Sequence, residues 1–181
     1  PNTDPLPEPE KELPFTDVKK SDWSYKAIKY MYDNKYISGT TSTTFSPKMK
    51  LTRGMLVTIL HNMEGKPNVS GKSKFPDVQN TNEYYYSAVK WASKNNIVNG
   101  YNNGKFGPND PITREQLAVM LNQYSIYKGT YQKTNADFSK FSDSNKISDF
   151  AKWGMNWAVG TGVITGTTEK TLIPQGTASR E

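Results

Sequence analysis

The chain has 181 residues, no cysteine and one histidine, and its 23 Lys and Arg exceed its 17 Asp and Glu to give a net charge of +6. The missing cysteine excludes a disulfide framework and thiolate metal sites, and a single histidine excludes a multi-histidine site. No segment approaches the roughly 20 apolar residues that a membrane-spanning helix needs. The composition therefore predicts no metal, no cofactor and no membrane insertion.

The charge is divided unevenly between a short acidic segment and a basic remainder. Residues 1–14 carry a net charge of −3 and five prolines, which predicts an extended, solvated linker. Subtracting −3 from the total of +6 leaves +9 for residues 15–181. A basic body is typical of proteins with an acidic partner, such as nucleic acid, anionic lipid or an anionic polysaccharide, although an ordinary soluble surface can carry the same charge.

Beyond the acidic segment, four short landmarks recur three times in the same order. The three copies of the second landmark end at Gly39, Gly100 and Gly166. We call the two sequence separations between these glycines the repeat offsets, and the third and fourth landmarks recur at the same separations. A common offset at separate landmarks indicates internal repeats. The landmarks are Phe-x-Asp at 15–17, 75–77 and 141–143, Ile/Val-x-Gly at 37–39, 98–100 and 164–166, Phe/Leu-x-Pro at 45–47, 106–108 and 172–174, and Thr/Ser-Arg at 52–53, 113–114 and 179–180.

The repeat offsets divide the chain into repeats at 15–70, 71–130 and 131–181. Each repeat opens with an aspartate-bearing turn and an amphipathic segment, which predicts a first helix. This helix is expected to end near Gly39, near Gly100, or near Gly162 and Gly166, where glycine suits a C-cap or a tight turn with positive φ. A Phe-x-Pro loop and a second helix follow. The second offset is longer because of a polar stretch, 127–140, which is predicted to be a linker. The sequence stops at Ser179–Glu181, so the third repeat is expected to lack its second helix.

The second helix of the middle repeat has the clearest predicted start. Thr113 is a candidate N-cap, and Gln116 completes the capping box Thr-x-x-Gln. In the first repeat, Gly54 and Met55 take the matching positions after Thr52, so that cap is expected to be weaker.

The fold class predicted is mostly α. A helix–loop–helix unit of about 60 residues cannot bury both of its apolar faces alone, so the repeats are expected to pack on one another as one structural unit. Three similar units without visible capping repeats favour closure into a pseudo-threefold bundle over an open solenoid.

The ordered set of Phe-x-Asp, Ile/Val-x-Gly, Phe-x-Pro and Thr-Arg, present three times over residues 15–181, resembles the S-layer homology (SLH) motif. Three tandem copies are the usual set in that family. The resemblance implies a three-pronged, pseudo-threefold helical domain of a secreted bacterial cell-surface or S-layer protein. It also implies non-covalent anchoring, without catalysis, to a secondary cell-wall polymer attached to peptidoglycan, commonly a pyruvylated polysaccharide that binds in grooves between adjacent repeats.

The recurring residues are suited to such a ligand. A pyruvate ketal places a carboxylate on a sugar, and arginine can bind a carboxylate bidentately. The dipole at a helix N-terminus disfavours a cation, so an arginine that recurs there indicates an anionic partner, which helix N–H groups also favour. The predicted polysaccharide-binding residues are Asp17, Trp23, Gly39, Thr52, Arg53, Asp77, Tyr84, Gly100, Thr113, Arg114, Asp143, Gly166 and Arg180.

Each of these residues also has a structural interpretation. The aspartates could cap a turn, the aromatic residues could lie in the core, the glycines could form turns, and the arginines could pair with carboxylates. The middle repeat matches the pattern best, which makes Arg114 the leading candidate, whereas Arg180 is expected at a free chain end. His61 is expected at the surface or its boundary.

Other functions remain open. The main alternative is a protein–protein assembly module of a surface lattice or scaffold that does not bind polysaccharide directly. A glycan-active enzyme would need opposed carboxylates, and nothing places Asp77 and Glu83 across a pocket. A calcium site in 102–110 lacks the closing glutamate of an EF-hand, and Lys and Arg do not cluster as in nucleic-acid-binding proteins. A neighbouring chain could supply the helix expected to be missing from the third repeat.

Overall fold

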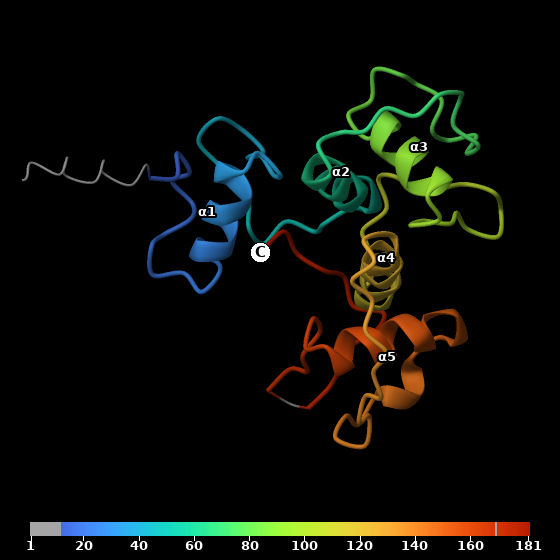
Figure 1. Cartoon of the computed structure of the whole chain (residues 1–181). Helices are drawn as coiled ribbons and strands as arrows, with labels where there is room; N and C mark the ends of the chain where they lie inside the picture. The colour runs from blue at the N-terminus through green and yellow to red at the C-terminus, as the bar shows by residue number, and fades with distance from the viewer. Residues whose placement is uncertain (1–11, 169) are drawn as a thin grey trace, which may run out of the picture. The chain divides into compact units, whose positions relative to one another are not determined.

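The computed structural model describes residues 12–168 and 170–181, so most of the predicted acidic linker lies outside the described residues. The described residues form helices and contain no strand beyond isolated bridges, which confirms the mostly α prediction. No described helix combines the length and apolarity needed to cross a membrane. The helices (Figure 1) are α1 (Tyr25–Asp33), α2 (Arg53–Met63), α3 (Tyr86–Lys94), α4 (Arg114–Tyr127) and α5 (Lys152–Gly160), with the 3-10 turns η1 (Ser144–Lys146) and η2 (Asp149–Ala151) before α5.

The first helix of each repeat, which is α1, α3 or α5, is followed by a residue with positive φ two positions after its last residue. These residues are Lys35, Asn96 and Gly162, with φ of 60°, 58° and 77°. After α3, the amide of Ile97 donates back to the carbonyl of Ala92 at 2.8 Å, which closes the helix end in the manner of a Schellman motif. The positive φ therefore falls just after the helix, and in the third repeat Gly162 confirms the predicted glycine C-cap.

The recurring glycines have a different role from the one predicted. Gly39, Gly100 and Gly166 do not have positive φ, so the prediction of a left-handed turn at these positions is wrong. A Cβ on Gly100 would lie 2.7 Å from the Phe75 ring and 2.6 Å from the Lys105 carbonyl oxygen, and the other two glycines meet the matching phenylalanines as closely. Glycine stands here because the aromatic ring of the Phe-x-Asp landmark packs against its backbone.

The chain forms two compact units, which we describe separately. The first comprises residues 12–47 with Glu181, and its core is Phe15, Val18, Ile28 and Phe45. The second comprises residues 48–180 apart from residue 169. In the second unit, α2 packs on α3 and α4 packs on α5, as Figure 1 shows. The second helix of one repeat therefore covers the first helix of the next repeat.

The packing of α2 on α3 buries the single histidine. His61 is only 6% exposed, its ring lies 5.3 Å from the Trp91 ring, and its Nε2 is 3.0 Å from the carbonyl oxygen of Pro67. The prediction of a surface or boundary position for His61 is wrong, because the helix face that carries it is the face that meets α3.

Three extended segments, one from each repeat, meet at a hub in the second unit. The amide of Leu51 donates to Ala178 at 2.9 Å, that of Ile112 to Leu51 at 2.8 Å, and that of Ala178 to Ile112 at 3.0 Å. These residues are equivalent under the repeat offsets, and each donates one bond and accepts one. The cycle is closed, as a pseudo-threefold arrangement requires and an open solenoid does not.

The polar stretch 127–140 is packed against α5, so the prediction of a linker is wrong. The Tyr131 ring lies 5.7 Å from the Trp153 ring, and the side chain of Asn156 donates to the carbonyl of Thr134 at 2.8 Å. Residues of this stretch form hydrogen bonds with Asn156 of α5. A segment without secondary structure needs such partners for its backbone groups.

Candidate functional site

In every repeat, the aspartate of the first landmark binds the loop of the third landmark. Both carboxylate oxygens accept the amides of the first two loop residues, at 2.7–2.9 Å. These groups are Asp17 with Phe45 and Ser46, Asp77 with Phe106 and Gly107, and Asp143 with Leu172 and Ile173. The turn-capping interpretation of the aspartates describes these contacts.

The carboxylates hold a loop conformation that the backbone alone would disfavour. The middle loop residues, Ser46, Gly107 and Ile173, have φ of 58°, 68° and 49°, which is costly for a β-branched residue. Burial raises the pKa of the Asp143 carboxyl, but the amides of Leu172 and Ile173 outweigh burial and hold that pKa below its ordinary value. The loop of the third repeat is thus held by an ionised carboxylate.

The arginine that opens each of α2 and α4 reaches into the loop of the following repeat. Arg53 donates from Nε to the carbonyl of Phe106 at 2.8 Å and from Nη2 to that of Asn99 at 3.2 Å. Arg114 makes the equivalent bonds to Leu172 at 2.7 Å and Thr165 at 3.0 Å. The Thr-Arg landmark predicts that the arginine lies at the start of the helix. Only the packing of the repeats brings its side chain to carbonyl groups of the following repeat.

The amides at the start of these helices are also occupied. Arg53 donates its amide to the carbonyl of Asp110 at 3.0 Å, and Gly54 to that of Pro108 at 2.8 Å. The equivalent bonds of α4 are Arg114 to Gly176 at 2.8 Å and Glu115 to Pro174 at 2.9 Å. The expectation that these first amides are available to an anion is therefore wrong, because loop carbonyls already satisfy them.

The side chains of Arg53 and Arg114 have no opposite charge at contact distance among the described residues. Among the described residues, neither Arg53 nor Arg114 takes part in an ion pair. Arg53 is only 4% exposed, and its guanidinium lies 4.6 Å from the Tyr101 ring centre and 4.8 Å from that of Phe106. Burial lowers the pKa of the Arg53 guanidinium from its ordinary value, although Tyr101, Asp110 and Asp77 oppose this shift at longer range.

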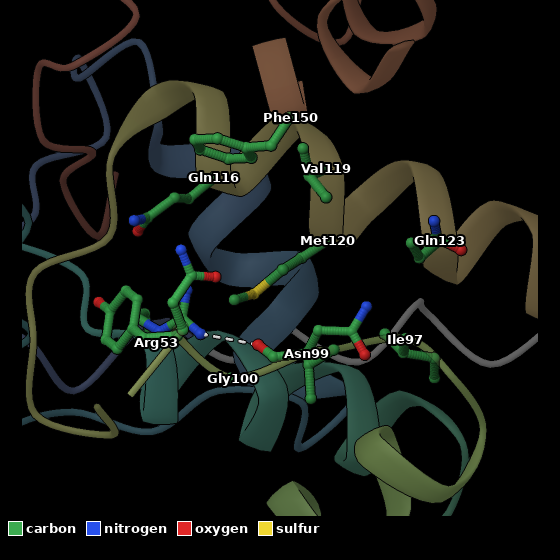
Figure 2. A pocket seen from close by; sticks show the side chains of 12 residues that line it. Arg53, Ile97, Asn99, Gly100, Gln116, Val119, Met120, Gln123 and Phe150 are labelled. Atoms are coloured by element: carbon green, nitrogen blue, oxygen red, sulfur yellow. Dashed lines mark hydrogen bonds between the residues drawn. The ribbon is translucent and has the colours of Figure 1, made fainter. Parts of the chain in front are cut away.

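Arg53 lies in a pocket of 490 Å³ within the second unit. Figure 2 shows residues of α4, among them Gln116 and Met120, above the loop that carries Asn99, with Phe150 of η2 beside them. Within the described part of the chain, Arg53 is the one charged residue that lines it, and the others are amides, a tyrosine or apolar. The lining residues are Arg53, Ile97, Val98, Asn99, Gly100, Tyr101, Asn102, Gln116, Val119, Met120, Gln123 and Phe150.

Of the predicted residues, Arg53 and Gly100 line this pocket. Trp23 and Tyr84 lie just before α1 and α3 and are exposed, as is Phe150, so the core interpretation of the aromatic position is wrong. These three side chains lie outside the core because the first helix of each repeat begins after this position.

The threonines act as N-caps. Thr113 accepts from the amide of Gln116 at 3.3 Å within a complete capping box, whereas Thr52 accepts from that of Met55 at 3.2 Å without one, which confirms the weaker first cap. The amide of Arg180 donates to the carbonyl of Met49 at 3.0 Å, so its backbone is held in place and the expectation of a free end is wrong.

Sequence reasoning missed most of the pocket wall. Phe150 takes the aromatic position of Trp23 and Tyr84 under the repeat offsets, but it is not among the predicted binding residues. Gln116 and Gln123 are two helical turns apart on α4, a spacing that puts two amides on one helix face. No group of three or more His, Asp or Glu in the described part of the chain is arranged to hold a metal ion.

Comparison with known proteins identifies the family. The family model of the S-layer homology domain matches residues 14–54, 74–118 and 140–181, and the chain belongs to this family. It is 34% identical over 169 residues to an endoglucanase of Bacillus sp. (strain KSM-635), covering 93% of this chain and 18% of that protein. It is 28% identical over 172 residues to exoglucanase XynX of Acetivibrio thermocellus, covering 94% of this chain and 15% of that protein.

A third relative is itself a surface-layer protein. The chain is 31% identical over 173 residues to the surface-layer 125 kDa protein of Lysinibacillus sphaericus, covering 92% of this chain and 14% of that protein. The chain thus spans less than a fifth of the length of these three relatives. An S-layer homology domain is a non-catalytic module that binds cell-wall polymers and anchors proteins at the bacterial cell surface.

Proposed function

We propose that the pocket around Arg53 binds an anionic secondary cell-wall polysaccharide attached to peptidoglycan, and that Arg53 recognises the carboxylate of a pyruvylated sugar. The observation that carries this proposal is a buried guanidinium in a pocket, where the described residues supply neither an ion pair to it nor a carboxylate to the lining. A buried charge without a partner is costly, and an anionic ligand would supply the partner.

The geometry of the guanidinium supports a carboxylate as the ligand. Two of its five N–H donors bond to the carbonyls of Phe106 and Asn99, and the others are available for a planar, two-oxygen acceptor. Those two bonds, and the rings of Tyr101 and Phe106, hold the group in one orientation before the ligand arrives. A pre-oriented donor binds more tightly because less rotamer entropy is lost.

The rest of the pocket is suited to a sugar. Asn102, Gln116 and Gln123 offer amides that can donate to and accept from hydroxyls, and Phe150 offers an exposed ring for the apolar face of a sugar. A second pocket of 350 Å³, lined by polar residues that include Asn103 and Asn109, shares Tyr101 with the first. The two pockets together give room for more than one sugar of a polymer.

The test uses an aromatic residue that can be removed without loss of the fold. Phe150 is exposed, so Phe150→Ala should leave thermal unfolding unchanged while weakening binding to purified cell walls by about 10-fold, as loss of a stacking contact does. Trp153→Ala is the matched control, because Trp153 is an exposed aromatic residue of α5 that does not line the pocket.

Binding is measured by co-sedimentation with three preparations: intact walls, walls stripped of secondary polymer, and walls whose polymer lacks the ketal. We expect binding to intact walls alone, and competition by a soluble pyruvylated amino sugar. Equal binding to stripped walls would overturn the polysaccharide ligand and favour an assembly module that binds protein. Equal binding to walls without the ketal would overturn the role of the carboxylate.

A further inference from the structure

Asparagine followed by glycine occurs twice in the chain, and both pairs lie in the segment between α3 and α4. The pairs are Asn99-Gly100 and Asn103-Gly104, and both asparagines are exposed. In such a pair the backbone nitrogen of the glycine can attack the side-chain amide carbon of the asparagine, because glycine has no Cβ to obstruct the approach. Since the two dipeptides are identical, their tertiary contacts decide which one reacts first.

Hydrogen bonds occupy both reacting groups of Asn103-Gly104. The side-chain Oδ1 of Asn103 accepts from the amide of Lys105 at 3.0 Å, and the amide of Gly104 donates to the carbonyl of Tyr101 at 2.9 Å. The nitrogen of Gly104 must give up its hydrogen bond and the side chain of Asn103 must leave the turn before the two can meet. Both changes raise the barrier to the reaction at this pair.

The contacts of Asn99-Gly100 are different and favour the reaction. Within the described ranges, neither the side chain of Asn99 nor the amide of Gly100 has a hydrogen-bond partner. Arg53 donates from Nη2 to the backbone carbonyl of Asn99 at 3.2 Å, which is the dashed line in Figure 2. This carbonyl and the nitrogen of Gly100 belong to one peptide group. A charged donor on the oxygen stabilises the negative charge that appears when the nitrogen loses its proton, so it makes the nitrogen a better nucleophile.

The same arginine bond occurs in the third repeat without an asparagine. Arg114 donates from Nη2 to the carbonyl of Thr165 at 3.0 Å, and Thr165 precedes Gly166. In the first repeat, Ser38 precedes Gly39. A hydroxyl side chain has no amide carbon for the nitrogen to attack, so the arginine bond and the asparagine coincide in the second repeat.

We infer that Asn99 is a site of spontaneous covalent modification, where deamidation converts the side-chain amide at the Arg53 pocket into a carboxylate. The nitrogen of Gly100 forms a bond to Cγ of Asn99, and the bond from Cγ to the side-chain nitrogen breaks. Ammonia leaves with the proton of the Gly100 nitrogen, and a cyclic imide remains. Water then adds to one of the two imide carbonyls and opens the ring, which gives aspartate or isoaspartate at position 99. No atom is oxidised or reduced.

A consequence for ligand binding rests on the proposed function. Asn99 lines the pocket beside Arg53, and either product places a negative charge there. A carboxylate next to the guanidinium repels an anionic polysaccharide and competes for the same N–H donors. Isoaspartate also lengthens the main chain next to Gly100, where a Cβ would lie only 2.6 Å from the carbonyl oxygen of Lys105. The reaction therefore lowers the affinity of the module as the protein ages.

The test follows both asparagines of the full chain during incubation at mildly alkaline pH, in the folded chain and in the chain unfolded by guanidinium chloride. Peptide mass spectrometry measures the conversion of amide to acid at each pair. We expect Asn99 to react about 10-fold faster than Asn103 in the folded chain, and the two to react at similar rates in the unfolded chain, where the tertiary contacts are absent. A folded-state rate at Asn103 equal to or above that at Asn99 would overturn the inference.

A transplanted pair tests the part played by the arginine. Thr165→Asn places an asparagine before Gly166, at a carbonyl that accepts from Arg114, so the new pair should react faster than Asn103 in the same folded chain. Adding Arg114→Ala to this variant should remove the advantage, and Arg114 is half-exposed, so its loss is expected to leave the chain folded. An unchanged rate at position 165 would show that the guanidinium does not promote the reaction.

Wall binding separates this inference from the proposed function. Asn99→Asp supplies one product directly and should weaken binding to intact walls by about 10-fold. Asn68→Asp adds the same charge at an exposed residue that lines neither pocket and should leave binding unchanged. Absence of binding by the unmodified chain would contradict the proposed function while the mass-spectrometric result stands. Undiminished binding by Asn99→Asp would overturn the loss of affinity with age.

Discussion

The loops of the second and third repeats are held by the same set of bonds in different surroundings. Asp77 and Asp143 each bind two loop amides, and Arg53 and Arg114 each bind two carbonyls. Arg53 is buried and lines a pocket, whereas Arg114 is half-exposed and is not among the residues that line it. The comparison teaches that the motif determines which bonds form, whereas the neighbouring helix decides how deeply they are buried.

We expect the largest change in the free energy of unfolding when the arginines are replaced. Arg53→Ala removes two bonds and leaves buried carbonyls without partners, so it should lower the free energy of unfolding by about 3 kcal/mol. Arg114→Ala, at a half-exposed position where water can replace the guanidinium, should cost about 1 kcal/mol. Urea unfolding of both variants measures the difference, and equal losses would show that burial does not separate the two sites.

Replacing the aspartates should change the free energy of unfolding less than Arg53→Ala does. Here the residue of the third repeat, Asp143, should cause the larger loss. Asp143 is 8% exposed and Asp77 is half-buried, so Asp143→Asn should cost about 2 kcal/mol and Asp77→Asn about 1 kcal/mol, since an amide side chain accepts one loop amide well and offers an N–H to the other. Asp137→Asn, at an exposed position whose carboxylate bonds within its own turn, is the control and should change unfolding little. A loss at Asp77 as large as that at Asp143 would contradict the burial argument.

Replacing the middle loop residue of the third repeat is expected to stabilise the fold. Ile173 has φ of 49° where the second repeat has Gly107, so Ile173→Gly should raise the free energy of unfolding by about 1 kcal/mol by removing strain at an exposed side chain. Ile173→Ala keeps a Cβ at this φ and should gain less. Thermal unfolding of the two variants tests the order, and a loss of stability in Ile173→Gly would show that the loop carries no strain.

The smallest expected effect concerns how the free energy of unfolding declines at acid pH. The pKa of Asp143 in the folded chain lies below its ordinary value, so its carboxylate stabilises the fold above the unfolded pKa, and this contribution is lost as the pH falls through the folded pKa. Asp143→Asn should therefore flatten the decline of stability below about pH 4 relative to the original chain. Unfolding midpoints from pH 2 to pH 7, a range set around the carboxyl pKa values, measure this change. Parallel curves would contradict it.

Much of the fold could be predicted because it depends on residues close together in the chain. Thr113 and Gln116 form the predicted capping box, since both partners lie within one turn. The glycines illustrate the limit. The sequence predicts a turn at Gly100, but its lack of a side chain makes room for the ring of Phe75, which precedes the first helix of the same repeat. The candidate site was predicted through Arg53 and Gly100, and its wall of amides on α4 was not.

The three repeats, their landmarks and the family can be recognised from the amino-acid sequence, because the offset between landmarks is itself a property of the sequence. Tertiary structure decided which arginine lies in a pocket and which partners it has. Arg53 meets Asn99 and Phe106 because α2 packs on the following repeat, and contacts between segments this far apart depend on the packing of helices and not on local pattern.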